Sequence, residues 1–265
     1  MTDSPPTAAN PPATPVPAAT ILLLRDTPQG MEVFMVVRHH QIDFASGALV
    51  FPGGKVDRQD SEPGAASRVA TYAGATPEQS VLRTAAIREL FEESGILLAR
   101  HLDGVSPVAN DEMDEWRDGL NNHTLSLAEL LHAGDLQLAC DDLVHFGHWI
   151  TPPMMPKRFD THFYLARVPA AQVAGHDGGE NVDSVWIGPQ QVVRDAAEGR
   201  RTVIFPTLCN VIRLAQYSSV AEALAESAAR PVLPVEPWTE MRADGHYLCI
   251  RQDAGYALNE QMLPV

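Results

Sequence analysis

The first part of the chain consists of short apolar runs separated by turn-forming residues. Ala19–Leu24 and Met31–Arg38 are rich in aliphatic and aromatic residues, and Asp26–Gly30 between them has the composition of a turn. This pattern predicts a β-hairpin. Ala48–Phe51 predicts a further strand, which is expected to stop at the Pro-Gly-Gly that follows it.

A loop and a long helix are predicted next. Residues 55–75 are rich in Asp, Ser, Gly and Pro, which is typical of a loop. The Thr-Pro-Glu-Gln run at 76–79 then supplies an N-cap, a proline at the first helical position and a capping box. Because Gly95 suits the position just after a helix, the helix is predicted to span Pro77–Ser94.

The second half of the chain alternates predicted strands with predicted helices. Strands are predicted at Val144–Ile150, Thr161–Val168, Val182–Ile187 and His246–Arg251. Helices are predicted at Pro189–Glu198, Leu208–Tyr217 and Val220–Ala229, and at Leu125–His132 within a mixed stretch over 101–142. Strands and helices that alternate in this way indicate an α/β or α+β fold.

The chain is expected to form one domain behind a disordered arm. Residues 1–17 contain six prolines among small residues, which is typical of disorder. Residues 18–265 are expected to fold together, with an insertion at about 58–75 and a helical C-terminal extension at about 199–265. This extension is expected either to cap a substrate pocket or to form a homodimer contact.

The charge balance restricts the partners. The 265 residues include 19 Lys and Arg against 34 Asp and Glu, a formal net charge of −15. Such a chain repels polyphosphate backbones, so binding to a nucleic acid polymer is not expected. A small phosphorylated substrate is compatible with the charge, because a divalent cation can neutralise both sides locally.

Composition also predicts the compartment. Cys140, Cys209 and Cys249 lie far apart and form no metal-type pair, which indicates a reducing environment. No apolar run approaches the roughly 18 residues of a membrane span, and no secretory signal is visible. A cytoplasmic location without membrane association is therefore expected.

Three carboxylates share one face of the predicted long helix. At about 100° per residue, Glu89, Glu92 and Glu93 fall at roughly 0°, 300° and 40°. They repel one another, and they lie near the helix C-terminus, where anions are disfavoured. A divalent cation would remove both penalties, and oxygen ligands suit Mg²⁺ or Mn²⁺. Taken alone, such a cluster favours a solvated acidic helix face, because runs of charged residues usually face water.

The histidine pairs do not suggest a metal site. His39 and His40 are adjacent in a predicted strand region, and alternation would place them on opposite faces. The same argument separates His145 from His148, which are three residues apart.

The residues around the three glutamates resemble the signature of the Nudix hydrolases. That pattern is G, five residues, E, seven residues, and then R-E-U-x-E-E-x-G-U, where U is aliphatic. Its second half matches here at Arg88, Glu89, Leu90, Glu92, Glu93, Gly95 and Ile96. The resemblance implies a mixed β-sheet between helices, with additional C-terminal helices.

The spacing before the helix departs from the family pattern. The pattern places 13 residues between its glycine and its arginine, whereas 33 residues separate Gly54 from Arg88. A loop insertion of this kind costs little free energy. Counting forward from Gly54 places the first carboxylate at Asp60, and counting back from Arg88 places it at Ser80. The sequence does not choose between these positions.

The insertion is similar to the split box of the peroxisomal-type coenzyme A diphosphatase branch. Gly47-x-x-x-Phe51-Pro-Gly-Gly54 also resembles the end of a motif that Nudix enzymes acting on coenzyme A often carry, R-[SA]-x-x-x-R-x-x-x-G-x-x-x-F-P-G-G. Arg38 matches its first arginine, but His39 and Asp43 replace the small residue and the second arginine.

The resemblance implies hydrolysis of a diphosphate linkage in a nucleoside diphosphate derivative. Glu89, Glu92 and Glu93 would hold Mg²⁺ or Mn²⁺. Arg88 would face away from Glu89 and pair with Glu92 across one turn of the helix. The backbone at Gly53 and Gly54 would approach the phosphate or the metal closely.

Further candidates lie outside the helix. Glu180, in a glycine-rich loop, is the candidate for an additional metal ligand. Arg38, Lys157 and Arg158 are candidates for contacts with substrate, and Phe159 is expected either to stack on a base or to fill the core. The general base is expected to be a helix glutamate or Glu180.

Coenzyme A or an acyl-coenzyme A is the favoured substrate. ADP-ribose or a dinucleotide on the same machinery is an alternative. A non-catalytic domain that senses a nucleotide is another, although the retention of all three helix glutamates favours hydrolysis.

Overall fold

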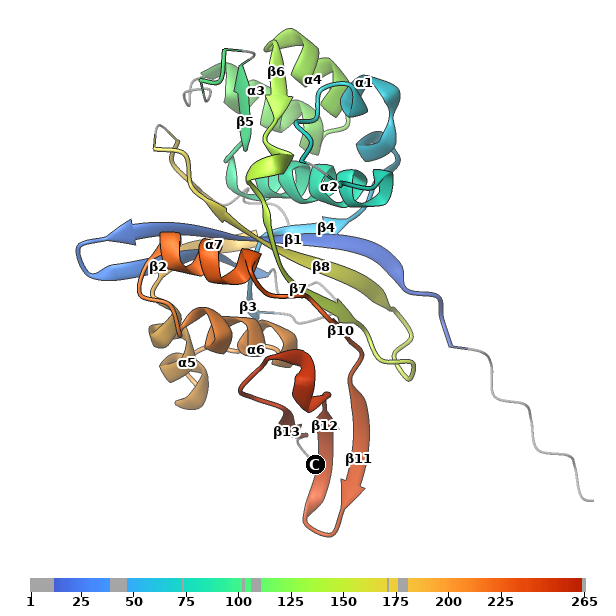
Figure 1. The fold of residues 1–265 in the computed structure, drawn as a ribbon, viewed down its shortest axis with the longest axis vertical. Helices are drawn as coiled ribbons and strands as arrows, with labels where there is room; N and C mark the ends of the chain where they lie inside the picture. Colours follow the sequence, from blue (N-terminus) through green and yellow to red (C-terminus); the bar gives the residue numbers. More distant parts are fainter. Residues whose placement is uncertain are drawn as a thin grey trace, which may run out of the picture.

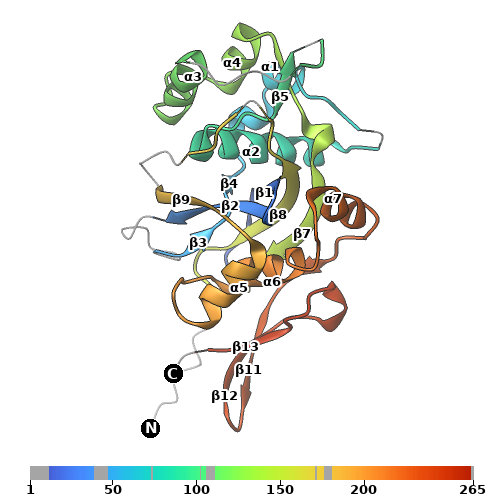
Figure 2. The same cartoon turned by 90° about the vertical axis from the view of Figure 1, so that its left-hand side faces the viewer.

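The computed structural model describes residues 12–38, 47–72, 74–101, 103–105, 111–170, 172–175 and 181–263. Within these ranges, a mixed β-sheet lies between two layers of helices (Figures 1 and 2). This arrangement confirms the predicted fold class, in which a sheet buries both faces against helices. None of the described helices combines the length and the apolar character that a membrane span needs.

Eight strands of the described residues form the main sheet. They are β1 Val16–Thr27, β2 Gly30–Arg38, β3 Leu49–Val50, β4 Gly53–Lys55, β7 Val144–Ile150, β8 Phe159–Arg167, β9 Asn181–Ile187 and β10 Pro234–Val235. The hydrogen-bonded order is β10-β7-β8-β1-β2-β3, and β4 pairs with β1 while β9 pairs with β2. The β1–β8 and β7–β10 pairs are parallel, and the others are antiparallel.

The long strand β1 positions the glycine-rich segment. Its C-terminal part pairs with β2 up to Thr27 opposite Gly30, which confirms the predicted hairpin. Its N-terminal part pairs with β4, where Thr20 lies opposite Gly53. The Pro-Gly-Gly was expected to end the strand at Ala48–Phe51. Strand β3 does end before Pro52, and the glycines then begin a second short strand, β4, because they can lie close against β1.

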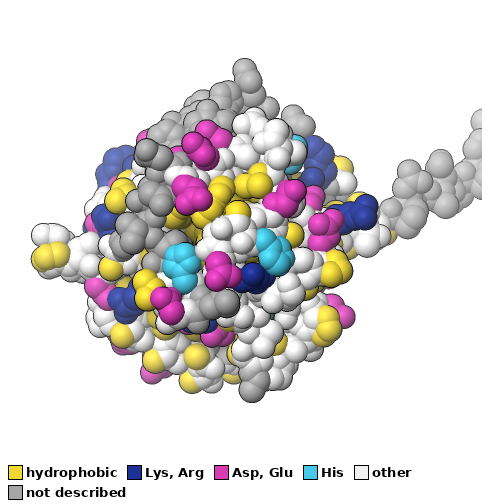
Figure 3. Space-filling model, turned by 90° about the horizontal axis from the view of Figure 1, so that it is seen from above, with side chains coloured by type: hydrophobic (Ala, Val, Ile, Leu, Met, Phe, Trp, Pro, Cys, Tyr) yellow, Lys and Arg dark blue, Asp and Glu magenta, His cyan; other side chains and the backbone are white. Residues whose placement is uncertain are grey.

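One helical layer contains the long helix α2. It comprises α1 Pro63–Ala66, α2 Pro77–Ser94, α3 Asp111–Asn121 and α4 Leu127–Ala133, together with the strand pair β5 Ala99–His101 and β6 Leu136–Leu138. Leu90 and Phe91 of α2 pack in one core with Tyr164 of β8. Acidic side chains are spread over the outer end of this layer (Figure 3), in keeping with the net charge.

The second helical layer covers the opposite face of the sheet. It comprises α5 Pro189–Ala197, α6 Phe205–Leu214 and α7 Val220–Ala228. Phe205 and Val220 pack in a second core with sheet residues such as Phe163. The predicted helices at 189–198, 208–217 and 220–229 are thus confirmed with small shifts of their ends.

The C-terminal region contains the predicted strand at His246–Arg251 and further strands, so it is less helical than predicted. Strands β11 Trp238–Arg242, β12 Gly245–Cys249 and β13 Glu260–Met262 form a separate antiparallel sheet beyond α6 (Figure 1). The Trp149 indole donates to the Tyr256 hydroxyl at 2.9 Å, and that hydroxyl donates to Asn210 Oδ1 at 3.0 Å. These bonds tie the C-terminal segment to β7 and α6.

Two stretches expected to be irregular or mixed contain helices. Within 55–75, a 3₁₀ helix (η1, Arg58–Ser61) precedes α1, and the Asp57 carboxylate caps it by accepting from Gln59 N. Helix α3 lies within the mixed stretch, and its few apolar residues, Met113, Trp116 and Leu120, recur at helical spacing among charged ones. The first strand also begins at Val16, slightly before the expected start of the domain.

A bulge in β7 changes the placement of two histidines. His145 lies opposite Tyr164, Gly147 opposite Phe163 and His148 opposite His162, so β7 carries one extra residue. The extra residue offsets the odd spacing of the two histidines, so the side chains of His145 and His148 face the same side of the sheet. The expectation that strand alternation separates them is therefore wrong. The pair at 39 and 40 lies outside the described residues.

Candidate active site

Helix α2 has the bounds that its sequence predicts. Gln79 N donates to Thr76 Oγ1 at 3.3 Å, and Thr76 N donates to Gln79 Oε1 at 3.1 Å, which completes the capping box. Gly95 ends the helix with φ 74°, a conformation that favours glycine. These local signals fix the rotation and the length of the helix, and thereby the direction of its glutamates.

Arg88 is the centre of the polar network on α2. Its Nη1 donates to Glu89 Oε1 at 3.0 Å and to Glu92 Oε2 at 2.8 Å. The predicted pairing with Glu92 is confirmed, whereas the expectation that Arg88 faces away from Glu89 is wrong. The guanidinium bends back along the helix, so one nitrogen reaches both carboxylates. Its Nη2 also donates to the carbonyl of Lys55 at 2.9 Å, which anchors β4 to the helix.

Asp60 occupies the position of the first glutamate of the Nudix pattern, for which the sequence offered two candidates. Arg88 Nε donates to its Oδ1 at 2.8 Å, and Nη2 donates to its Oδ2 at 3.0 Å. Both side chains are buried. Of the two candidates for the first carboxylate, the structure therefore favours Asp60, which was found by counting forward from Gly54. The other candidate, Ser80, lies in the first turn of α2. Asp60 lies near the start of the insertion, so the added length that follows it leaves this contact intact.

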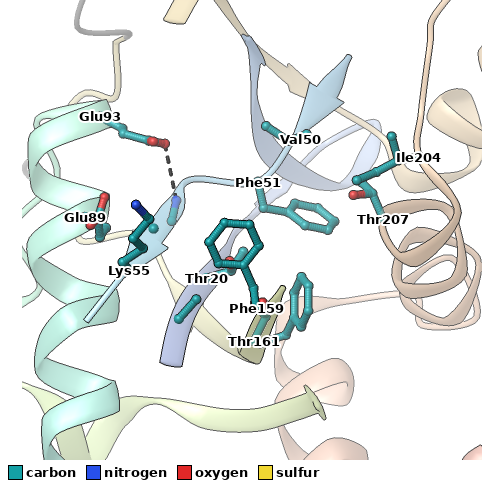
Figure 4. Close-up of a pocket in the computed structure, with 14 residues that line it drawn as sticks. Thr20, Val50, Phe51, Lys55, Glu89, Glu93, Phe159, Thr161, Ile204 and Thr207 are labelled. Carbon is teal, nitrogen blue, oxygen red and sulfur yellow. Dashed lines mark hydrogen bonds between the residues drawn. The ribbon is translucent and has the colours of Figure 1, made fainter. Parts of the chain in front are cut away.

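The glycine-rich strand lies directly against the glutamates. Gly53 N donates to Glu93 Oε2 at 3.3 Å (Figure 4). A Cβ atom placed on Gly54 would lie 2.5 Å from the Glu89 carboxylate, closer than side-chain contacts allow. The absence of a side chain at Gly54 is thus what lets Glu89 lie beside β4.

Burial raises the pKa of two of the glutamates in the absence of a cation. Burial raises the pKa of Glu89 to about 7, and the charge of Glu92 adds to the rise while Arg88 opposes it. Burial likewise raises the pKa of Glu92. Four carboxyl groups, those of Asp60 and the three glutamates, lie around a single arginine in this cluster. A bound cation would restore the ionised form.

Helix α3 stabilises the C-terminal end of α2. Arg117 Nε donates to the carbonyl of Glu92 at 2.9 Å, and Asn121 Nδ2 donates to the same oxygen at 3.3 Å. A cation at a helix C-terminus is favourable. These contacts offset part of the penalty for placing carboxylates near this end.

Two hollows meet at the glutamates. The first, called the carboxylate hollow, has a volume of about 780 Å³ and is lined by Arg88, the three glutamates, and Asp118, Asn121, Asn122 and His123 at the end of α3. The second, called the aromatic hollow, has a volume of about 430 Å³ and is lined by Phe51, Phe159, Phe163, Thr20, Thr161, Ile204 and Thr207, among others (Figure 4). Lys55, Glu89 and Glu93 line both. A ligand with a polyanionic centre and a flat or apolar arm fits this pair of hollows.

The other predicted site residues have different surroundings. Arg158 is buried, and its guanidinium donates to the carbonyls of Thr151 and Ala13 and pairs with Glu236. These contacts hold the N-terminal segment, so the geometry gives no support to the expected substrate contact. Lys157 is exposed, and it lines neither hollow.

Two further candidates cannot be placed. Glu180 and the side chain of Arg38 lie outside the described residues. The backbone of Arg38 pairs with Asn181 at the end of β2.

Sequence reasoning missed several residues that line the hollows. Lys55 directly follows the Pro-Gly-Gly, and this adjacency is the signal that could have identified it. Asn121 and His123 belong to a helix end that the sequence did not predict. Thr20 and Thr207 come from segments far apart in the chain, and only the tertiary fold brings them together.

Comparison with known proteins identifies the family. A family model described as the NUDT19 Nudix domain matches residues 62–214. This match covers more than half of the chain and includes the helix with the three glutamates.

Individual relatives agree with this match. "Putative nudix hydrolase 7" of Caenorhabditis elegans is 30% identical over 200 residues, which cover 75% of this chain and 60% of that protein. "Acyl-coenzyme A diphosphatase NUDT19" of Homo sapiens is 24% identical, with 91% of this chain and 73% of that protein covered. The chain thus spans less than two thirds of the length of the nematode relative.

One solved structure is covered almost completely by its match to this chain. The crystal structure of a NUDIX hydrolase from Alicyclobacillus acidocaldarius superimposes with a TM-score of 0.70 and 26% sequence identity. The match covers 82% of this chain and 99% of that one.

Proposed function

The chain belongs to the Nudix hydrolase family, and from this premise we propose that it hydrolyses the diphosphate linkage of a nucleoside diphosphate derivative. The favoured substrates are coenzyme A and acyl-coenzyme A. The observation that carries the proposal is the placement of Glu89, Glu92 and Glu93 beside the Gly53–Gly54 backbone, where a polar hollow meets an aromatic one.

The glutamates fit a hard divalent cation. They offer carboxylate oxygens on one helix face, and burial leaves their negative charge poorly compensated by Arg88 alone. We propose that Glu89, Glu92 and Glu93 hold Mg²⁺ or Mn²⁺. When bound, such an ion supplies activation of a water molecule and neutralisation of charge on the departing phosphate.

The remaining residues orient the reacting groups. Arg88 fixes the Glu89 and Glu92 carboxylates through direct hydrogen bonds, and Asp60 fixes Arg88 in turn. Lys55 lines both hollows, where its charge can attract the diphosphate. The general base is a helix glutamate or Glu180. Glu180 stays a candidate for a further ligand.

The aromatic hollow supports a substrate with an extended arm. Rings from Phe51, Phe159 and Phe163 can stack on adenine or cover an apolar chain. Phe51 belongs to the Phe-Pro-Gly-Gly segment that resembles the coenzyme A motif. The human relative is named an acyl-coenzyme A diphosphatase, which supports the same substrate class.

A substrate panel in ¹⁸O-labelled water tests the proposal. Coenzyme A, an acyl-coenzyme A, ADP-ribose and a dinucleotide are incubated with Mg²⁺ or Mn²⁺, and the products are analysed by mass. We expect two phosphate-ester products from coenzyme A or its acyl form, with one ¹⁸O atom in the product whose phosphorus is attacked. Turnover of ADP-ribose or the dinucleotide alone would reassign the substrate within the family.

Two matched variants separate an enzyme from a sensor. Glu92→Gln and Glu93→Gln should each lower turnover about 100-fold or more, because a metal-assisted step depends on several kcal/mol of charge stabilisation. Circular dichroism controls for folding. Tight nucleotide binding by the unmodified chain without turnover of any substrate would instead indicate a sensing domain.

A further inference from the structure

A second cluster of ligand-type side chains lies on strands β7 and β8. His148 Nε2 lies 2.5 Å from Asp160 Oδ1, and His162 Nε2 lies 4.0 Å from the same oxygen. One ligand atom from each residue falls within 4.8 Å of the other two. The rings of His148 and His162 stack with their centroids 4.0 Å apart.

The β7 bulge and the cross-strand register create this cluster. His148 lies directly opposite His162, and Asp160 lies opposite Ile150 on the same strand pair. Asp160 and His162 alternate with Phe159, Thr161 and Phe163, which line the aromatic hollow. The cluster therefore faces the other side of β8 and belongs to neither hollow.

Solvent can reach the cluster, although the imidazoles are largely shielded. The side chains of His148 and His162 are 18% and 19% exposed, and that of Asp160 is 38% exposed. An ion can thus enter without unfolding, and one coordination position would stay open to water.

A neighbouring histidine lies against His162. His145 Nε2 lies 3.0 Å from His162 Nδ1, within hydrogen-bond distance. A hydrogen bond between these nitrogens would place the Nδ1 proton of His162 toward His145 and leave its Nε2 available to bind a metal.

The geometry points to a transition-metal site formed by His148 Nε2, Asp160 Oδ1 and His162 Nε2, with His145 as the outer partner that orients His162. Two imidazoles and one carboxylate suit Zn²⁺ and neighbouring first-row ions rather than Mg²⁺. Ligand atoms around a tetrahedral zinc ion lie about 3.4 Å apart. The two observed separations from Asp160 Oδ1, 2.5 and 4.0 Å, lie on either side of that spacing.

Zinc titration tests this site separately from the glutamates. The full chain without a polyhistidine tag is freed of metal, placed in excess Mg²⁺ to fill the carboxylate site, and titrated with Zn²⁺ against a chromophoric chelator. We expect one zinc ion per chain, and a rise in the thermal unfolding temperature because zinc would cross-link β7 and β8.

The variants identify the ligands. His148→Gln and His162→Gln should abolish zinc binding, and His145→Gln should weaken it about 10–100-fold, as loss of an outer partner does. His246→Gln, which alters an exposed histidine on β12, and Glu92→Gln should leave it unchanged. Absence of zinc binding by the unmodified chain, or binding that survives in His148→Gln and His162→Gln, would overturn the inference.

A measurement on the unmodified chain avoids any folding defect in the variants. Co²⁺ should give visible absorption bands of tetrahedral intensity, and Zn²⁺ should shift the ¹⁵N signals of His148 Nε2 and His162 Nε2. Signals from these nitrogens that do not change on addition of zinc would contradict the assignment. Failure of coenzyme A hydrolysis would leave the assignment of the zinc site unaffected, because the zinc site and the glutamate site share no residue.

Discussion

Arg88 and Asp60 form a buried two-point ion pair across 28 residues of sequence, with contacts of 2.8 and 3.0 Å. The pair joins the start of the inserted segment to the helix that carries the glutamates. Arg88 also contacts Glu89 and Glu92, so the position of both carboxylates depends on this pair.

Asp60→Ala should destabilise the protein and reduce activity. Removing one partner of a buried ion pair costs about 3–5 kcal/mol, and the lower end is expected because Arg88 keeps its other contacts. Urea unfolding measures the change in free energy. Glu32→Gln, which breaks a partly exposed pair with Arg25, should cost at most about 1 kcal/mol. Equal losses in the two variants would contradict the role given to Asp60.

Gly54→Ala should impair catalysis more than folding. The added methyl group would lie 2.5 Å from the Glu89 carboxylate, which must move away. A displacement of about 1 Å at a reacting group can cost about 100-fold in rate. Steady-state kinetics measure this loss. Gly175→Ala serves as the control, since an added Cβ there meets no atom within 4 Å. Unchanged kinetics in Gly54→Ala would show that Glu89 need not lie against β4.

Metal affinity should fall as the pH falls below about 7. Burial raises the pKa of Glu89 to about 7 in the absence of metal, so protons compete with the cation in this range. Calorimetric titration of Mn²⁺ at several pH values measures the effect. Glu89→Gln should bind Mn²⁺ more weakly and lose the pH dependence near 7. A variant that kept the full dependence would assign the titration to another group.

Phe159→Ala should weaken binding of the substrate without slowing the chemical step. Loss of stacking on a base costs about 1–3 kcal/mol, which corresponds to about a 5- to 150-fold rise in KM. The value of kcat should stay the same, because stacking on a base stabilises the bound substrate and the transition state equally. Met154→Ala, on the exposed preceding turn, is the matched control. A fall in kcat with unchanged KM would place Phe159 in a different role.

Local signals made α2 predictable and left other features hidden. The capping box at Thr76 and the glycine at Gly95 lie within the helix's own sequence, so its bounds follow from neighbouring residues. The Asp60–Arg88 pair depends on how the inserted segment folds back, which no local pattern encodes. The β7 bulge likewise reverses the parity of His145 and His148, because strand alternation assumes an unbroken ladder.

Segments with few apolar residues account for the remaining differences between the predicted and the observed elements. Helix α3 has a mainly charged sequence, and its role is to hold the end of α2 through Arg117 and Asn121. Strand β11 alternates poorly because both of its faces are largely exposed. Lys157 and Arg158 are equally basic neighbours in sequence, and only the fold shows that Arg158 is buried against Thr151, Ala13 and Glu236.

The central claim is that Glu89, Glu92 and Glu93 gather on α2 to hold a divalent cation. Anomalous diffraction from a crystal soaked in Mn²⁺ with coenzyme A tests it most directly. We expect an anomalous peak coordinated by oxygens of these glutamates, beside the Gly53–Gly54 backbone and in contact with the diphosphate. Glutamate oxygens with no manganese near them, while the diphosphate binds elsewhere, would contradict it.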